Sequence, residues 1–396
     1  MLSHILHLGV GNFFRAHQAH YTHNAAGWDI TGVSFRSATV RDGLAAQGYR
    51  YALVIKDAAG TEITPITCLR DILVAPEDPE PVLARIADPA TQVITLTVTE
   101  KAYCLGPDGR LDLSDAAVHA DLIGGAMTVV GALARGLARR TAPVTVLSCD
   151  NLPGNGAKLG AAVARFAEAA ELHLTARVTF PSCMVDRITP ATTDAIRAEA
   201  DDPMAVPTEA FTEWVVEDDF AAARPDWPGV QWVTDVAPHE MRKLRMLNGA
   251  HSYLAYAGTL AGHVFVHEAV ADPVLRHGAA ALMAEAAETL PDAVRGQAAD
   301  YARALLRRFD NPNLHHRLRQ IAMDGSQKMP IRIAQTIVAR HGPSPALQAA
   351  VTAWIDFVRA EVAAGRPLDD PQAAALVNAC AAEAPDAALR AMIMPE

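Results

Sequence analysis

The N-terminus places a short apolar run, a glycine turn and a helical pattern in immediate succession. Residues 5–8 are mostly apolar, Gly9-Val10-Gly11 follows at once, and a helical pattern continues from there to Ala25. A strand, a glycine turn and a helix are the order in which a doubly wound α/β fold presents backbone N–H groups to a pyrophosphate. Phe14 stands where the third glycine of that pattern is expected, so the turn by itself is a weak signal.

Strand-like and helix-like runs alternate from this turn to about residue 235. Such alternation predicts a parallel sheet with crossover helices. The predicted strands are residues 5–8, 30–35, 51–55, 93–97, 144–148, 177–180 and 214–216. The predicted helices between them are residues 79–86, 120–139, 156–170 and 191–198.

Strand patterns stop after Pro238, which can open a helix that Gly258 ends. Further helices are predicted from Pro273, from Pro291, and over residues 343–364 and 371–382. The proline-rich residues 224–238 look like a connection. We therefore predict an α/β, Rossmann-like doubly wound domain over residues 1–235, which binds a dinucleotide. A mainly α-helical domain over residues 236–396 is expected to carry substrate binding and catalysis.

The bulk composition excludes several classes of protein. The 396 residues are long enough for two domains, and 51% hydrophobic with 20% charged residues is typical of a globular protein. The net charge of −11 argues against nucleic acid or an anionic membrane surface as a partner. The five cysteines lack CxxC spacing, which argues against a disulfide framework and fits a reducing compartment. We expect a cytoplasmic protein with no secretion signal, no membrane span and no bound metal.

A polar cluster lies in the helix predicted after Pro238. Its members Glu240, Lys243, Asn248 and His251 fall within an arc of roughly 140° at about 100° per residue. A solvated surface stripe is the alternative interpretation of such a face. If protein covers the helix, burial lowers the pKa of Lys243. A neutral amine is a proton acceptor, which oxidation of an alcohol by hydride transfer requires.

This helix is expected at the domain junction, facing the carboxyl edge of the sheet. Thr99 and Lys101 come directly after one predicted strand, where residues line the nicotinamide ribose, with a solvated loop as the alternative. Asn151 follows another strand and can donate its amide N–H to a substrate oxygen. Lys328 either reaches a polyhydroxylated or carboxylated substrate or is an ordinary surface lysine.

Five short motifs stand out along the chain: Gly9-x-Gly11-x-Phe13-x-Arg15-Ala16-His17, Thr99-Glu100-Lys101, Cys149-Asp150-Asn151, Trp214-Val215-Val216-Glu217-Asp218 and Lys243-x₄-Asn248-x₂-His251. Together they resemble those of the polyol-specific long-chain dehydrogenases, the mannitol 2-dehydrogenase family that includes the fructuronate and tagaturonate reductases. The resemblance runs over nearly the whole chain. The glycine turn of this family tolerates a bulky third position, which accounts for Phe14.

The resemblance implies a metal-independent, NAD(P)-dependent oxidoreductase that interconverts a polyol and its ketose. It implies that Lys243 is the catalytic base and acid, with Asn151 and Asn248 stabilising the developing oxyanion. It also implies that His251 orients the substrate and that Glu240 is a proton-relay carboxylate. The implied cofactor-binding residues are Gly9, Gly11, Asn12, Phe13, Arg15, Arg36, Thr99 and Lys101. The implied substrate-binding residues are Asn151, Lys243, Asn248, His251 and Lys328.

Cofactor and substrate each keep an alternative. The resemblance implies NAD, but Phe35-Arg36-Ser37 lacks the acidic residue that binds a ribose 2′-OH, so NADP held by Arg36 stays open. The rival substrate is a hexuronate reduced to an aldonate, whose carboxylate would favour Lys328, Arg317 or Arg319. A non-catalytic dinucleotide-binding sensor is the alternative from another class. The sequence does not define an oligomeric state.

Overall fold

The computed structural model describes residues 3–124 and 127–394. The chain divides into two compact units, Met1–Ala237 and Pro238–Glu396. Part of the proline-rich segment 224–238 was interpreted wrongly as a connection, because Gln231–Val233 forms strand β12 and pairs with a strand of the first unit.

The first unit is built on a six-stranded sheet with the strand order β5-β2-β1-β6-β7-β8. All of its pairings are parallel. Its strands are β1 (Ser3–Leu8), β2 (Trp28–Ser34), β5 (Leu69–Val74), β6 (Thr91–Leu96), β7 (Val144–Ser148) and β8 (Val178–Thr179). Numbered within this sheet, the order is the 3-2-1-4-5-6 arrangement of dinucleotide-binding sheets. The order reverses between β1 and β6, so a ligand is expected beyond the carboxyl ends of these two strands.

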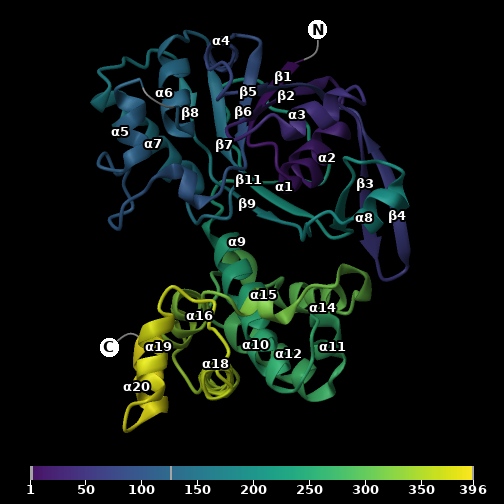
Figure 1. The fold of residues 1–396 in the computed structure, drawn as a ribbon, viewed down its shortest axis with the longest axis vertical. Coiled ribbons are helices and arrows are strands. Elements are labelled where there is room, and N and C mark those ends of the chain that lie inside the picture. Colours follow the sequence, from purple (N-terminus) through teal and green to yellow (C-terminus); the bar gives the residue numbers. More distant parts are fainter. Residues whose placement is uncertain (1–2, 125–126, 395–396) are drawn as a thin grey trace. The chain divides into compact units, whose positions relative to one another are not determined.

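Helices cover both faces of this sheet (Figure 1). Successive residues of β1 point to opposite faces, so Ile5 belongs to one apolar core and Leu6 to the other. One face is packed by α4 (Glu80–Ala87), α6 (Val129–Ala138) and α7 (Asn155–Ala169). The other face is packed by α1 (Asn12–Ala16), α2 (Gln18–His23) and α3 (Thr39–Ala45). Burial on both sides is why these strands read as continuous apolar runs.

Two of the predicted strands do not belong to the parallel sheet. Strand β3 (Tyr51–Asp57) pairs antiparallel with β4 (Gly60–Ile66) and parallel with β10 (Val206–Glu209) in a separate sheet. Strand β11 (Glu213–Glu217) lies in a third sheet with β9 (Cys183–Asp186) and β12. The sequence pattern identifies a strand without identifying its partner, which is why these assignments to the parallel sheet were wrong.

The predicted helix over residues 120–139 is interrupted. Helix α5 (Ala116–Leu122) ends before α6 begins, and residues 125–126 lie outside the described residues. Asp121 accepts hydrogen bonds from the backbone N–H and the hydroxyl of Thr128, at 2.6 and 2.7 Å. Thr128 in turn caps α6 by accepting the N–H of Gly131. This side-chain capping starts a new helix where the apolar pattern is continuous.

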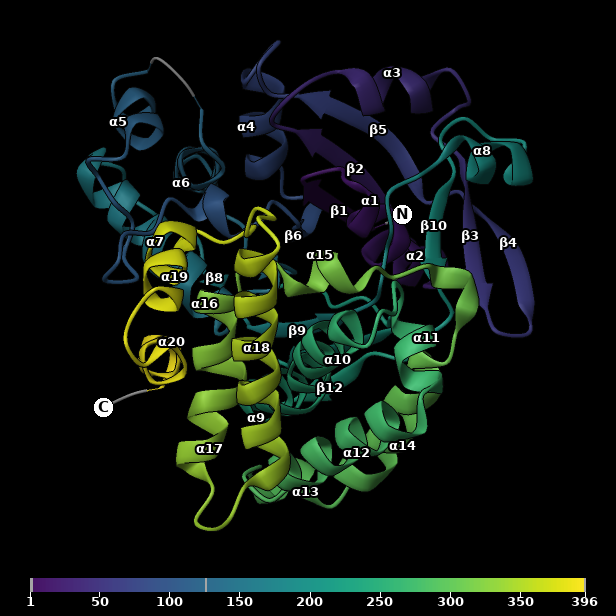
Figure 2. The same ribbon diagram turned by 60° about the horizontal axis from the view of Figure 1, so that its bottom comes forward.

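The regular elements of the second unit are all helices within its described residues, apart from one isolated bridge between Phe265 and Arg317. Its elements are α9 (Ala237–Arg242), η2 (Lys243–Asn248), α10 (Gly249–Leu260), α11 (Val266–Ala271), α12 (Pro273–Ala287), α13 (Asp292–Arg295), α14 (Ala298–Phe309), η3 (Pro312–Leu314), α15 (Leu318–Ala322), α16 (Gly325–Met329), η4 (Pro330–Ala334), α17 (Gln335–Ala339), α18 (Pro345–Ala363), α19 (Ala373–Cys380) and α20 (Pro385–Ile393). Helix α10 is buried along most of its length and contacts α12, α15 and α18 (Figure 2). A parallel-sheet α/β unit followed by a helical unit is the predicted fold class, which is confirmed.

The helix predicted from Pro238 to Gly258 is not α-helical throughout. Its middle segment η2, which begins at Lys243 and ends at Asn248, is a π-helix. A second π-helix, η4, contacts η2. π-Helical turns are rare and occur frequently at functional sites. No helix in the described part of the chain combines the length and the apolar composition that crossing a membrane requires.

Candidate active site

A hollow of about 560 Å³ lies in the first unit, beyond the carboxyl ends of β1, β2 and β6. Its lining includes five of the predicted cofactor-binding residues: Gly9, Gly11, Arg36, Thr99 and Lys101. They come from three loops that follow three different strands, so the fold brings together residues that are distant in the sequence. The hollow is located at the strand-order reversal, where doubly wound sheets bind dinucleotides.

The absence of a side chain has a different structural consequence at each of the two glycines of the turn. Gly9 has a φ of +100°, and a Cβ atom there would lie 2.2 Å from the carbonyl oxygen of Thr97. Gly11 has an ordinary φ of −72° and precedes α1. A Cβ atom on Gly11 would meet no protein atom within 4 Å, because it would project into open space. Gly9 therefore allows the loops after β1 and β6 to approach, while Gly11 leaves the room that a pyrophosphate needs.

Phe14 does not obstruct this turn. Its side chain is fully buried and stacks on His7 with 3.7 Å between ring centroids. The bulky third position therefore contributes to the core beneath the turn rather than facing the hollow.

Three other predicted cofactor-binding residues, Asn12, Phe13 and Arg15, are outside the lining of the hollow. The buried guanidinium of Arg15 donates to the side-chain oxygen of Asn12 and to the carbonyl of Met204. Phe13 stacks on His17 with 5.1 Å between ring centroids. These contacts hold α1 against its own unit.

The loop at the end of β2 carries a cation and no acid. Arg36 is exposed there, between Phe35 and Ser37. The hydroxyl of Ser34 shapes the loop by donating to the carbonyl of Ser37 at 2.8 Å. The side chain of Arg36 is therefore presented at the edge of the hollow where an adenosine ribose lies in related folds.

Asp150 organises the edge between β6 and β7. Its buried carboxylate accepts the backbone N–H groups of Val98 and Thr99, at 2.9 and 2.8 Å, and the hydroxyl of Tyr103 at 2.9 Å. Burial raises the pKa of Asp150, and these donors act against that shift. Thr99 has a φ of +73°, a strained conformation for a residue with a β-branch. Asp150 thus holds the strained loop next to the exposed Asn151, a role that the sequence did not reveal.

The remaining predicted catalytic residues lie in the second unit, along one continuous helical segment. Glu240 is on α9, Lys243 and Asn248 are the first and last residues of η2, and His251 is on α10. The Lys243 side chain is only 9% exposed, so a solvated surface stripe is the wrong interpretation.

The π-helical turn changes the angular relation between Lys243 and Asn248. Hydrogen bonds in a π-helix join residues i and i+5, so each residue turns through a smaller angle than in an α-helix. Residues five apart therefore lie more nearly above one another. The arc computed from α-helical geometry overstated the separation, and the backbone brings the amine and the amide onto one face.

His251 is 8% exposed and lies among aromatic rings. Its ring centroid is 4.6 Å from that of Phe309 and 5.4 Å from that of His316. Burial, with His316 and nearby arginines, holds the pKa of His251 well below its usual value. The imidazole is therefore neutral near neutral pH. Its buried Nε2 atom has no hydrogen-bond partner among the described residues, so this polar atom is available to a ligand.

Lys328 is half-buried rather than on the surface. Its Nζ atom donates to the carbonyl of Met323 at 2.6 Å and lies 3.6 Å from the carboxylate of Asp324. Burial lowers the pKa of Lys328, and the neighbouring Arg332 lowers it further. This lysine therefore belongs to a partly enclosed cationic group.

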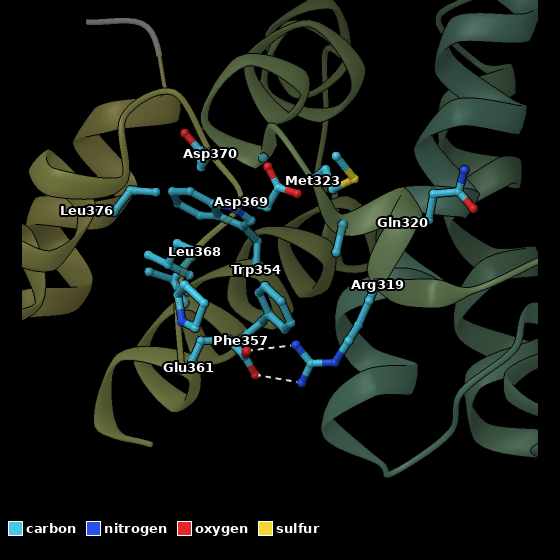
Figure 3. A pocket seen from close by; sticks show the side chains of 14 residues that line it. Arg319, Gln320, Met323, Trp354, Phe357, Glu361, Leu368, Asp369, Asp370 and Leu376 are labelled. Carbon is cyan, nitrogen blue, oxygen red and sulfur yellow. Dashed lines mark hydrogen bonds and ion pairs between the residues drawn. The ribbon is translucent and has the colours of Figure 1, made fainter. Parts of the chain in front are cut away.

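The two arginines considered for a substrate carboxylate have other contacts. Arg319 binds the carboxylate of Glu361 through two hydrogen bonds of 2.8 and 3.1 Å (Figure 3). Arg317 lies over the ring of Phe265, with its guanidinium carbon 5.5 Å from the centroid. Arg319 borders a separate hollow of about 390 Å³ in the second unit, which is also lined by the acidic side chains of Asp369 and Asp370. These surroundings do not favour a bound carboxylate.

In the part of the chain that the structure describes, no group of three or more His, Cys, Asp or Glu side chains is arranged to hold a metal ion.

Comparisons with known proteins extend over nearly the whole chain. Residues 3–229 match the model of the mannitol dehydrogenase Rossmann domain, and residues 235–393 match that of the mannitol dehydrogenase C-terminal domain. A D-mannonate oxidoreductase of Escherichia coli is 39% identical, with 94% of this chain and 84% of the relative covered. A mannitol 2-dehydrogenase of Pyrenophora tritici-repentis is 38% identical, with 98% and 75% covered.

A solved structure gives the same result. The Pseudomonas fluorescens mannitol 2-dehydrogenase, in a ternary complex with NAD and D-mannitol, has a TM-score of 0.82 and 32% identity. The match covers 99% of this chain and 91% of that one. The resemblance drawn from the five motifs is thus confirmed, and the chain belongs to the mannitol dehydrogenase family.

Proposed function

We propose that this protein is an NAD-dependent oxidoreductase that interconverts a secondary alcohol of a polyol or aldonate with the corresponding ketone. The observation that carries the proposal is the buried Lys243, joined to Asn248 by one π-helical turn. The hollow at the strand-order reversal supports it, since its glycine turn fits a dinucleotide. Relatives named as oxidoreductases, and one solved with NAD and D-mannitol, support the same reaction.

In this proposal the two units have separate tasks. Residues 1–235 bind the dinucleotide, with Gly9 and Gly11 at the pyrophosphate and Thr99 and Lys101 at the nicotinamide ribose. NAD, when bound, supplies the hydride acceptor. Residues 236–396 supply most of the groups that bind and activate the substrate.

Lys243 acts on the proton of the reacting hydroxyl. In oxidation its neutral amine accepts that proton, and in reduction its ammonium form returns it. Asn151 and Asn248 donate amide N–H groups to the developing alkoxide. The neutral imidazole of His251 hydrogen-bonds and orients the substrate, and Glu240 passes the proton onward.

The activity is tested by assaying D-mannitol, arabinitol, fructose and fructuronate with each nicotinamide cofactor in both directions. We expect NAD(H)-dependent turnover of at least one of them. NADH binding without turnover of any would favour the sensor alternative over an enzyme.

The cofactor preference is tested at Arg36. Because this exposed guanidinium is positioned to pair with a 2′-phosphate, Arg36→Asp is expected to weaken NADPH binding about 10-fold or more. NADH affinity should stay within about twofold, since NADH has no charge at that position. Fluorescence titration of each reduced cofactor measures both constants. Arg50→Asp, at another exposed arginine of the same unit, is the matched control. Equal losses for both cofactors would show that Arg36 does not contact the 2′ position.

A further inference from the structure

Arg332 is the feature of the second unit that the proposed function leaves unused. It lies on the π-helix η4, which contacts the π-helix η2 that carries Lys243 and Asn248. Its Nη1 atom donates to the hydroxyl of Ser252 at 3.1 Å. Ser252 is adjacent to His251 on α10. The fold of this unit therefore places a guanidinium next to the residues predicted to bind substrate.

The guanidinium of Arg332 is not paired directly with a carboxylate of the described residues. Its Nε atom is buried without a hydrogen-bond partner in the described part of the chain. Among the described residues, no carboxylate forms an ion pair with it. Burial lowers the pKa of Arg332 despite the opposing influence of Tyr256 and Asp324. A desolvated guanidinium without an anion is unfavourable, so a bound anion would stabilise this arrangement.

Other arginines of the same unit show the contrast. Arg319 binds Glu361, Arg276 binds Asp310 through two hydrogen bonds, and Arg340 binds Glu288. Each of these forms an ion pair with a carboxylate of the chain itself, although the Nε and Nη1 atoms of Arg340 are buried without a hydrogen-bond partner among the described residues. Arg332 differs from these three because its hydrogen bond goes to a neutral hydroxyl. Arg245 of the same unit also donates to a neutral group, the carbonyl of Thr289, but it does not lie beside His251.

The neighbours of Arg332 add positive charge and nitrogen atoms that have no hydrogen-bond partner among the described residues. Lys328 precedes it by four residues on the same helical segment, and the two cations influence each other. The buried Nε2 of His251 and the buried Nδ1 of His316 have no hydrogen-bond partner among the described residues. Among the described residues, Asp324 forms the one ion pair with Lys328, at 3.6 Å from its Nζ atom, and the negative charge of Asp370 also acts on this lysine. The group as a whole therefore favours an anionic ligand.

We infer that Arg332 binds a carboxylate of the substrate, and that the substrate is a sugar acid rather than an uncharged polyol. The inference rests on the proposed function, since it specifies the substrate class of the same site. A planar guanidinium with unused N–H groups can bind a carboxylate through two hydrogen bonds. The carbon chain of the sugar acid would then extend from Arg332 past His251 toward Lys243.

The experiment compares D-mannonate with D-mannitol, which differ in having a carboxylate or a CH₂OH group at one end. For the wild-type protein with NAD we expect kcat/KM for D-mannonate to exceed that for D-mannitol by at least about 10-fold to 100-fold. Equal or better turnover of D-mannitol would overturn the inference while leaving the proposed function intact. Absence of turnover of both, and of every other polyol and sugar acid in the screen, would overturn the proposed function instead.

Substitution of Arg332 locates the carboxylate. Arg332→Gln is expected to lower kcat/KM for D-mannonate about 10-fold to 100-fold, mainly through KM, with D-mannitol turnover changed less than about threefold. Arg332→Lys keeps the positive charge but loses the forked geometry of the guanidinium. Its kcat/KM for D-mannonate should therefore lie between those of the wild type and Arg332→Gln. Arg276→Gln, which removes a half-exposed surface ion pair, is the matched control and should change neither substrate. NADH titration of each variant checks that the cofactor unit is unaffected.

Loss of turnover for both substrates in equal measure would contradict a carboxylate contact and indicate a structural role for Arg332. If Arg332→Gln does not fold, the wild-type comparison and Arg332→Lys still decide the question. Arg332→Lys with unchanged turnover of D-mannonate and D-mannitol, together with no wild-type preference, would rule out the inference.

Discussion

Replacing Lys243 by alanine or arginine is expected to lower kcat by about 10²–10⁴-fold, the usual cost of losing one general base. Alanine removes the amine. Arginine keeps the positive charge but cannot accept a proton near neutral pH, so it should be nearly as inactive as alanine. The measurement is steady-state oxidation of the best substrate with saturating NAD. A residue that only filled space would instead tolerate arginine better than alanine.

Two controls separate loss of chemistry from loss of structure. Lys158→Ala removes a lysine from α7 in the first unit and should leave kcat within about twofold. NADH affinity of the Lys243 variants should match that of the wild type, because the cofactor residues lie in the first unit. A Lys243→Ala protein that kept turnover within a few-fold of wild type would refute the assignment of this amine as the proton acceptor.

The sequence was sufficient for the fold class and for the loops around the hollow. Buried parallel strands read as apolar runs, so β1, β2, β6 and β7 were predicted close to their observed bounds. Strand β5 was missed because Arg70 and Asp71 interrupt its apolar run. The assignment of β3 and β11 to the parallel sheet was wrong. The partners of a strand depend on contacts between residues far apart in the chain, which the local pattern does not contain.

For the candidate site, too, local sequence patterns predicted some features, while others depend on contacts that only the folded chain makes. Spacing was enough to place Lys243, Asn248 and His251 in one helical segment. The π-helical turn was not predictable, since an i+5 hydrogen bond leaves no distinctive residue pattern. Arg332 and Asp150 were missed for another reason: the significance of each depends on what surrounds its charge. Arg332 has no carboxylate partner in the part of the chain that the structure describes, and Asp150 accepts the backbone N–H groups of Val98 and Thr99.

The glycine turn offers a second large effect, in which stability and binding respond to different substitutions. Gly9→Ala forces a side chain into a φ of +100° and places its Cβ atom 2.2 Å from the Thr97 carbonyl oxygen. Backbone strain alone costs about 1–3 kcal/mol, and relief of the clash displaces the loop after β6. We expect the Tm of the ligand-free protein to fall by roughly 2–12 °C. Differential scanning calorimetry without cofactor measures this change.

Gly11→Ala should have the opposite profile and is the matched control. Gly11 has a φ of −72°, and its added Cβ atom would meet no protein atom within 4 Å, so the Tm should change by less than about 1 °C. The methyl group would instead occupy the space through which a pyrophosphate approaches the backbone, and the Kd for NADH should rise about 10-fold or more. Because one substitution affects the folded chain and the other affects only its ligand, the pair distinguishes a structural glycine from a binding one. Unchanged NADH affinity in Gly11→Ala would show that the pyrophosphate does not bind beside Gly11. The unchanged Tm of this variant would exclude misfolding as a confounding effect.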